Sequence, residues 1–411
     1  MKFDIFLSLC QAEVEGVIPT ERLMYENFFS QVQLADALGF EVAWVGEGHF
    51  SSTVQKQNPE PVIPFFSGEV ALNCDVLHVA PRIFRLTRRI GVGSAIRNIL
   101  CNGGPLAHAE QLKMFLSIHG LDHEETRKIH LGFASGRFAY ANRPYGISPR
   151  NPTENLAWPE LKAKLFIAAT EVFYRALGRE PFATSDLAPL CLGPEDFGDG
   201  ERWQLVQASY GREHPQGEAG EQLYFPHFWQ FERLAVLPFD APLALLDLTV
   251  GSYDPRVQEL ANGFFPTKVF NLSYTPQATI EATHRRLQAC FHPQGGPWRR
   301  DYLPRTSLIF IDASPQLSPA QQNARAKERA SKTLETYWRA MQGTVSAGKI
   351  AEELSNALWG NPEQIVEQIH GRFHKDDRLL CWFDFCCHDN AQVRQQMQWF
   401  MEKVAPQCMY L

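Results

Sequence analysis

Short apolar segments alternate with longer segments of helical periodicity along almost the whole chain of 411 residues. In the first pair, FDIFLSL (3–9) predicts a strand, and ERLMYENFFSQVQLADALGF (21–40) has its apolar residues at helical spacing. The predicted strands cover residues 3–9, 41–47, 89–98, 128–136, 243–251, 267–273, 306–313 and 378–386. Eight strand–helix units favour an α/β fold, the closed (β/α)8 or TIM barrel. The alternative, a doubly wound sheet, needs a glycine-rich phosphate loop after its first strand, and SLCQAEVEGV is not such a loop.

The regular pattern is interrupted between the fourth and fifth predicted strands. Residues 179–240 are rich in proline, glycine and aromatic residues, and LYFPHFWQFERLAVLPF (223–239) indicates a hairpin. So long an irregular segment is unusual in a compact domain unless it serves a function. We therefore predict a single barrel domain over residues 1–411, with residues 179–240 as an insertion that shapes a substrate pocket or a partner surface.

Charge and composition argue against several classes of protein. The formal net charge is −7 and no long basic block occurs, so neither nucleic acid nor an anionic membrane is an expected partner. No apolar run reaches the roughly 18 residues that a membrane span needs, and Asp4 interrupts the first apolar run where a signal peptide would continue. Nine scattered cysteines lack disulfide or metal-site spacing. We expect a cytoplasmic protein without a metal site.

Polar residues follow directly after several predicted strands, at the end of a barrel where active sites lie. The second strand ends in Glu47, Gly48 and His49. Side chains two apart in an extended chain share a face, so the carboxyl and the imidazole are expected together. His49 titrates closest to neutral pH and is the candidate proton-transfer group, with a hydrogen-bonded structural histidine as the alternative. The other strand ends are Ser94–Asn98, Ala134–Arg137, Gly251–Tyr253, Asn271–Tyr274, Asp312 and Asp384.

Two of these strand ends have features of a cofactor site. In TVGSYDPRVQELANG (249–263) a strand ends and a helix begins, so the free amides and the Ser252 hydroxyl would suit a phosphate group. Simple capping of the helix by Ser252 or Asp254 is the alternative. In FASGR (133–137) the small residues let a flat ring approach the backbone, and Arg137 is placed to meet an anion.

Six segments together resemble the bacterial luciferase-like monooxygenases, a family of flavin-dependent (β/α)8 barrels. They occur in the order typical of that family and extend over essentially the whole chain. The segments are MKFDIFLSL, LADALGFEVAWVGEGHF, IGVGSAI with PLAHAEQLKMF, LGFASGRFAYANRPYG, VGSYDPRVQELANG, and GNPEQIVEQI with FMEKVAPQ.

The resemblance implies a flavoprotein oxidoreductase that uses reduced FMN from a separate flavin reductase, or in some branches the deazaflavin F420. With FMN, dioxygen adds to ring carbon C4a, and the peroxide oxidises a small organic substrate. A homodimer is expected by the same analogy. By position, the resemblance assigns Gly251, Ser252 and Tyr253 to the flavin phosphate, Ser94, Ala95, Ala134 and Ser135 to the isoalloxazine ring, Glu47 and His49 to the reacting edge, and Arg137 and Arg150 to a phosphate or substrate contact.

Two positions depart from the light-emitting members of the family. Gly48 stands where they carry a histidine, their proposed base, and Ala134 stands where they carry a reactive cysteine. Light emission from a long-chain aldehyde is therefore not expected, and an open space at Gly48 favours a bulkier, biosynthetic substrate. Two other functions stay open, namely hydride transfer with F420 and flavin binding without turnover.

Overall fold

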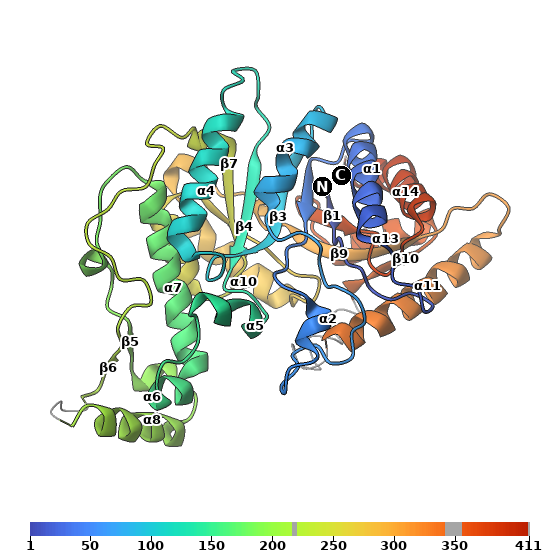
Figure 1. Cartoon of the computed structure of the whole chain (residues 1–411). Helices are drawn as coiled ribbons and strands as arrows, with labels where there is room; N and C mark the ends of the chain where they lie inside the picture. The colour runs from blue at the N-terminus through green and yellow to red at the C-terminus, as the bar shows by residue number, and fades with distance from the viewer. Residues whose placement is uncertain (216–219, 342–355, 410–411) are drawn as a thin grey trace.

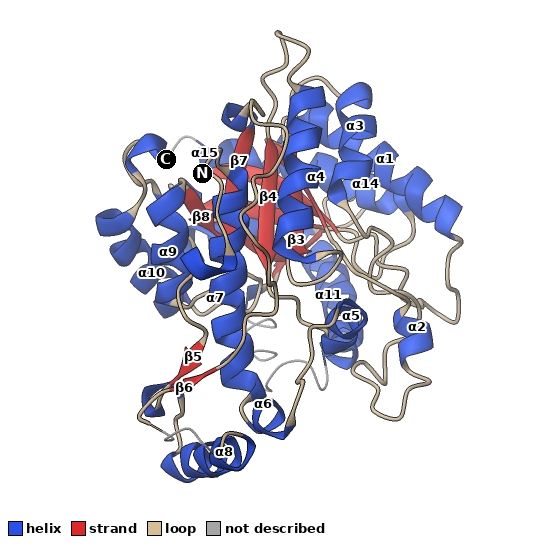
Figure 2. Cartoon of the chain, turned by 60° about the vertical axis from the view of Figure 1, so that its left-hand side comes forward, coloured by secondary structure: helices blue, strands red, loops and turns tan. Residues whose placement is uncertain are grey.

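The computed structural model describes residues 1–215, 220–341 and 356–409. Nine strands form one parallel sheet in the spatial order β10-β9-β11-β1-β2-β3-β4-β7-β8. The sheet curls, and its strands lie at the centre of the molecule with helices around them (Figure 1, Figure 2). The strands are β1 (Lys2–Leu7), β2 (Val42–Val45), β3 (Gly91–Asn98), β4 (Ile129–Ala134), β7 (Leu246–Val250), β8 (Thr267–Val269), β9 (Arg305–Ile311), β10 (Leu358–Gly360) and β11 (Arg378–Trp382).

The chain just beyond β8 is hydrogen-bonded to the start of β9. The amide of Asn271 donates to the carbonyl of Pro304 at 2.8 Å, and the amide of Thr306 donates to the carbonyl of Asn271 at 3.1 Å. Asn271 thereby forms a parallel bridge with Arg305. All eight strands predicted from the sequence are present and parallel, so the α/β class is confirmed.

Helices follow the strands and pack on the outside of the sheet (Figure 2). The first, α1 (Glu21–Leu38), begins where the Thr20 hydroxyl accepts a hydrogen bond from the amide of Leu23, and ends at Gly39, whose φ of 93° is left-handed. Strands β2 and β9 are buried along their whole length, as expected for parallel strands covered on both faces. Further helices beside the sheet are α3 (Val76–Leu86), α4 (Gly104–His119), α9 (Pro255–Phe264), α10 (Gln277–Cys290), α11 (Pro319–Met341), α13 (Pro362–Arg372), α14 (Asn390–Trp399) and α15 (Ala405–Met409). Two short helices, α2 (Ser52–Gln55) and α5 (Ala139–Asn142), lie in loops below the strands in Figure 1.

Two helices and one strand differ from the sequence-based prediction. The apolar spacing over 154–178 predicts one helix, but the structure has two, α6 (Pro152–Leu156) and α7 (Trp158–Leu177), with Pro159 in the first turn of α7. The spacing over 389–403 predicts a final helix there, and the structure continues it from α14 through a π-helical turn into α15. Strand β10 was not predicted, because three residues are too few to show a period.

Residues 179–240 form most of an arm that extends away from the sheet at the lower left of Figure 1. The arm contains a helix, α8 (Gly200–Glu213), and a small apolar core of its own around Trp203 and Leu192. The hairpin predicted over 223–239 is wrong. Instead, β6 (Leu223–Tyr224) pairs with β5 (Cys191–Leu192), because the best partner for this strand lies earlier in the chain.

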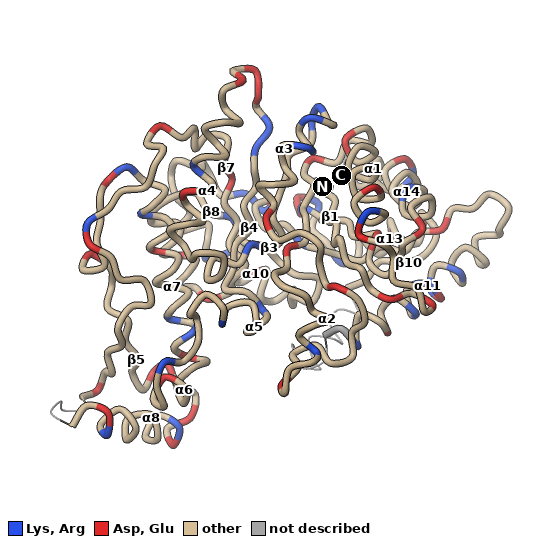
Figure 3. Tube along the Cα trace, in the orientation of Figure 1, with Lys and Arg blue, Asp and Glu red and all other residues tan. Residues whose placement is uncertain are grey.

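The charged residues are distributed over the whole trace, with acidic and basic side chains interspersed (Figure 3). Within the described ranges, no helix combines the length and the apolar character that a membrane crossing requires.

Candidate active site

A cavity of about 410 Å³ lies at the carboxyl end of the sheet. Strand ends, the loops that follow them and Tyr337 of α11 form its walls. Its volume is typical of small-molecule sites, roughly 300–1,000 Å³. The residues predicted from the sequence that line it are Glu47, His49, Ala95, Ala134, Ser135, Arg137 and Gly251. The predicted residues Ser94, Arg150, Ser252 and Tyr253 lie outside its lining.

The carboxyl of Glu47 and the imidazole of His49 lie side by side in this cavity. Glu47 Oε1 and His49 Nε2 are 3.9 Å apart, which is too far for a hydrogen bond. The two side chains are 1% and 8% exposed, and neither atom has a hydrogen-bond partner among the described residues. Glu47 Oε2, in contrast, accepts from Ser94 Oγ at 3.2 Å and from the amide of Val76 at 3.4 Å. One oxygen therefore fixes the carboxyl group, and the other is left for a ligand.

Burial sets the protonation of this pair. Removal from water raises the pKa of Glu47 to about 7, and the positive charge of Arg97 offsets only part of that rise. Burial, helped by Arg97, lowers the pKa of His49 below its usual value. Glu47 therefore titrates near neutrality, whereas the pKa of His49 lies below its usual value. The sequence does not show this difference, because it does not show how deeply each group is buried.

A buried ion pair lies next to Glu47. Arg97, in β3, is 1% exposed and donates to both carboxylate oxygens of Asp75, at 2.5 and 3.3 Å. Its Nε donates to Nδ1 of His108 at 2.7 Å, and its Nη2 also binds Gln111. Asp75 in turn is the N-cap of α3. The sequence analysis missed this network, although an arginine within an apolar strand was a usable signal, since arginine is rarely buried without a partner.

The ends of β3, β4 and β7 form a wall of small residues. The register of β3 against β4 shifts between Ser94 and Arg97, and Ala95 and Ile96 both line the cavity as a result. A Cβ added at Gly251 would lie 2.7 Å from Ile96 and 3.4 Å from Ala134. The backbone of Gly251 therefore packs directly against Ile96 and Ala134, with no room for a larger side chain. The wall that these strand ends form suits the face of a planar ring such as an isoalloxazine.

The space beside Gly48 is smaller than the sequence suggested. A Cβ at this position would lie 3.2 Å from the Cβ of Ala71 and 3.7 Å from Val70. The loop after β2 folds back here, and the Gly48 amide donates to the carbonyl of Asn73 at 2.9 Å. Gly48 still lines the cavity, but Ala71 and Val70 occupy the direction in which its side chain would point, so this part of the loop narrows the space expected there.

The helix after β7 begins at Pro255, so Ser252 and Tyr253 lie in the turn before it. Asp254 is the N-cap of α9, where its carboxylate accepts from the amide of Arg256 and pairs with the guanidinium at 2.8 Å. The Ser252 hydroxyl, two residues earlier, accepts from the amide of Asp254 at 3.2 Å. The Tyr253 hydroxyl binds Thr275. Helix capping thus accounts for Asp254, whereas the hydroxyl proton of Ser252 has no acceptor among the described residues.

Basic side chains differ in how they relate to the cavity. Arg137 lies at its exposed mouth and donates to the hydroxyl of Tyr274 at 2.8 Å. Arg150 is held by Glu154 at 2.6 Å and packs on the ring of Phe228, so it is tied to the arm. Half-buried Lys162 in α7 donates to the carbonyl of Gly136 at 3.2 Å, and the described chain offers it no carboxylate at ion-pair distance. Lys162 is a further candidate for binding an anion. The sequence contains no signal for it, because a lysine within a predicted helix is usually an exposed surface residue.

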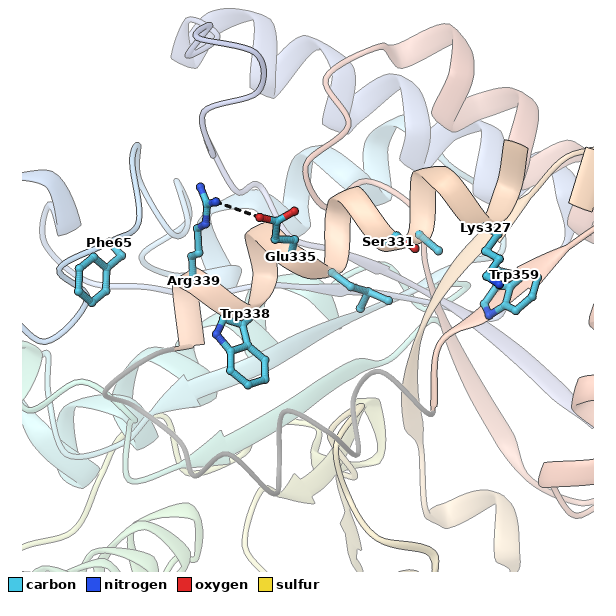
Figure 4. A pocket seen from close by; sticks show the side chains of 9 residues that line it. Phe65, Lys327, Ser331, Glu335, Trp338, Arg339 and Trp359 are labelled. Atoms are coloured by element: carbon cyan, nitrogen blue, oxygen red, sulfur yellow. Dashed lines mark hydrogen bonds and ion pairs between the residues drawn. The ribbon is translucent and has the colours of Figure 1, made fainter. Parts of the chain in front are cut away.

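A larger and more open hollow of about 860 Å³ lies along α11, between Phe65 and Trp359 (Figure 4). Phe65, Trp338 and Trp359 border it, together with the ion pair of Glu335 and Arg339 at 2.9 Å. The predicted strand-end residues are absent from the described part of its lining. Because catalytic groups of such folds lie at the strand ends, the smaller cavity is the candidate active site.

No protein-family profile matches the chain, and no curated protein matches it. Solved structures do match over its whole length. Monooxygenase RslO1 from Streptomyces bottropensis has a TM-score of 0.65 at 16% identity, over 99% of each chain. The oxygenating constituent of 3,6-diketocamphane monooxygenase from Pseudomonas putida, a type II Baeyer–Villiger monooxygenase in complex with FMN, has a TM-score of 0.58 at 14% identity, over 99% of this chain and 98% of that one.

An F420-dependent secondary alcohol dehydrogenase, in complex with an F420–acetone adduct, matches as well. Its TM-score is 0.53 at 11% identity, over 100% of this chain and 99% of that one. Identities this low establish the fold alone. The resemblance to the luciferase-like flavin monooxygenases is thereby confirmed as a shared fold, which FMN-binding and F420-binding proteins both use.

Proposed function

We propose that this protein is an FMN-dependent monooxygenase that oxygenates a small organic substrate. The observation that carries the proposal is a single cavity in which a flat wall of small residues adjoins a buried carboxyl and imidazole with unpartnered atoms. Bound reduced FMN supplies the electrons that activate dioxygen. The chain supplies the position of the ring, the exclusion of water and the proton.

Residues of three neighbouring strands hold the cofactor. Ala95, Ala134 and Gly251, which line the cavity, would hold the isoalloxazine ring, with Ser135 beside them at the end of β4. Ser252 would hold the phosphate, as a hydrogen-bond donor through its hydroxyl. Arg137 and Lys162 supply positive charge, Tyr253 fixes the turn through Thr275, and Ser94 acts indirectly by holding Glu47. Arg150 supports the arm through Glu154.

Glu47 and His49 handle the proton. A general acid works best when its pKa lies near the operating pH, and that of Glu47 is about 7. Its neutral form donates from Oε1, and the neutral imidazole of His49 accepts or relays at Nε2. The aromatic side chains around the cavity keep water out, which protects a reactive oxygen species from wasteful decay.

The proposal extends to the whole molecule. The sheet closes into an eight-stranded barrel through the Asn271–Arg305 bridge, with β10 outside the ring beside β9. Residues 1–411 form one domain with residues 179–240 inserted. The protein works as a homodimer and receives reduced FMN from a separate reductase.

Cofactor titration and product analysis test the proposal. FMN should bind and F420 should not, and chemically reduced FMN with dioxygen should give a product that contains one oxygen atom from dioxygen. His49→Ala should lower coupled oxygenation by about 10²–10⁴-fold with FMN affinity unchanged. His78→Ala is the matched control, since His78 also lies beside Asp75 but is 85% exposed. Wild-type oxygenation by His49→Ala would remove His49 from the mechanism.

Hydride transfer with F420 is the second candidate, supported by the match to the F420-dependent dehydrogenase. Selective F420 binding and substrate oxidation without dioxygen would establish it. Release of hydrogen peroxide alone, without any oxygenated product, would instead indicate a flavin-binding protein without turnover.

A further inference from the structure

We infer that the half of the cavity away from the small-residue wall binds an uncharged substrate built on a planar ring system, with a substrate oxygen held by Thr306. This inference rests on the proposed function, because it assigns this half of the cavity to the substrate and the small-residue wall to the flavin.

Aromatic side chains from separate parts of the chain form this half, here named the aromatic wall: Phe6, Tyr337, Trp382 and Phe385. The rings of Phe6 and Trp382 are 4.7 Å apart at 64°, and those of Trp382 and Phe385 are 5.1 Å apart at 65°. Tyr337 contacts Trp382 at 5.8 Å and 90°. Rings packed edge to face hold one another in place and offer apolar surfaces to a planar ligand.

The charges of the described lining lie outside the aromatic wall. Glu47 and His49 adjoin the small-residue wall, and Arg137 lies at the exposed mouth, where it binds Tyr274. A carboxylate group on the substrate would therefore leave water without a counter-charge in the aromatic wall, which is costly. An uncharged substrate avoids that loss.

Thr306 supplies a polar contact in this half, as does the indole Nε1 of Trp382, which is also buried without a hydrogen-bond partner among the described residues. Thr306 lines the cavity and is 3% exposed, and its Oγ1 is buried without a hydrogen-bond partner among the described residues. Buried polar atoms normally have partners, so this hydroxyl is suited to a ligand oxygen. A rigid ring system also loses less conformational freedom on binding than an alkyl chain does, which favours it in a site with fixed walls.

Calorimetric titration of the FMN-loaded protein tests the substrate class with three probes: naphthol, naphthoate and decanal. Naphthol is expected to bind at least about tenfold more tightly than either of the others, a difference of about 1.4 kcal/mol. Equal or tighter binding of naphthoate or decanal would overturn the inference.

Variants locate the binding site. Phe385→Ala should weaken naphthol binding by about tenfold or more, whereas Phe239→Ala, at a phenylalanine that is 47% exposed and outside the cavity lining, should not. Thr306→Val, which keeps the side-chain shape, should weaken naphthol binding but not that of naphthalene, which has no oxygen. Wild-type affinity of Thr306→Val for naphthol would overturn the role of Thr306.

The two proposals fail in different ways. If FMN does not bind, the proposed function falls, and naphthol can still be titrated against the cofactor-free protein through its tryptophan fluorescence. If FMN binds and naphthol does not, the substrate inference alone is overturned.

Discussion

The two carboxylate oxygens of Glu47 have different surroundings. Oε2 is held by Ser94 and by the amide of Val76, whereas Oε1 is buried without a described partner, 3.9 Å from His49. A buried carboxyl that lacks full hydrogen bonding keeps its proton to a higher pH than an exposed one. In the sequence, Glu47 is an ordinary acidic residue after a strand. In the folded protein, its carboxyl group titrates near neutral pH.

Glu47→Gln should change how stability depends on pH. The pKa of Glu47 is about 7 in the folded protein and about 4.5 when unfolded, so folding retains a proton between these values. Wild-type stability should therefore fall as pH rises from 4.5 to 7 and level off above, by up to about 3 kcal/mol relative to Glu47→Gln. Urea unfolding of both proteins at several pH values measures this. Asp384 also has a raised pKa, but its effect on the pH dependence is the same in both proteins and drops out of the difference between their stabilities. A constant difference across the range would contradict the assignment.

Arg97→Met should destabilise the protein strongly. The substitution leaves the carboxylate of Asp75 buried without its cation, which typically costs about 3–5 kcal/mol. Arg22→Met is the control, because Arg22 and Glu26 form an exposed pair worth under about 1 kcal/mol. Denaturant unfolding of both variants gives the comparison, and equal effects would show that the buried pair contributes no more than a surface pair.

At the scale of elements, the turn between β7 and α9 determines which amide and hydroxyl groups are available to bind an anion. Asp254 already satisfies the first amide of α9, so the helix N-terminus is only partly available to a phosphate. The Ser252 hydroxyl and the chain next to Gly251 are the parts of the turn that remain near the cavity.

Ser252→Asp should weaken FMN binding by at least about tenfold, because it places a negative charge beside the phosphate, while a carboxylate before a helix does not harm folding. Ser318→Asp makes the same change before α11, where the Ser318 hydroxyl accepts from the amide of Gln321, and should leave FMN affinity unchanged. Fluorescence titration of FMN with both variants decides the matter, and equal affinities would place the phosphate elsewhere.

At the scale of the whole molecule, the curl of the sheet brings backbones of neighbouring strands into close contact with interior side chains. A Cβ at Gly132 in β4 would lie 2.2 Å from the carbonyl oxygen of Ser94 and 3.5 Å from the ring of Trp44. Trp44 also donates to Asp4 at 2.8 Å, so the ring has little freedom to move.

Gly132→Ala should therefore destabilise the protein by about 1–3 kcal/mol through overpacking. Gly263→Ala is the matched substitution in α9, where a Cβ would meet nothing within 4 Å, and it should stabilise by about 0.5–1 kcal/mol. Thermal or urea unfolding should show opposite signs. A neutral Gly132→Ala would mean that the strands can shift apart at little cost.

Local spacing in the sequence was sufficient to predict the order of strands and helices. Each strand such as 128–136 or 306–313 is short, apolar and bounded by turns, and these are properties of neighbouring residues. The strand ends that carry Ala95, Ala134 and Gly251 were also predicted to meet at one edge, as parallel strands do, and all three residues line the cavity. The hairpin over 223–239 failed, because the partner of β6 lies far back in the chain, at β5.

The sequence by itself determined the alternation of strands and helices and the residue types at the strand ends, since both follow from local periodicity. Only the tertiary structure decided how those residues behave. Arg97 meets Asp75 and His108 because β3, α3 and α4 pack together, and the loop after β2 closes on Gly48. The proton affinities of Glu47 and His49 depend on removal from water and on charges that come from distant segments, so no window of sequence contains them.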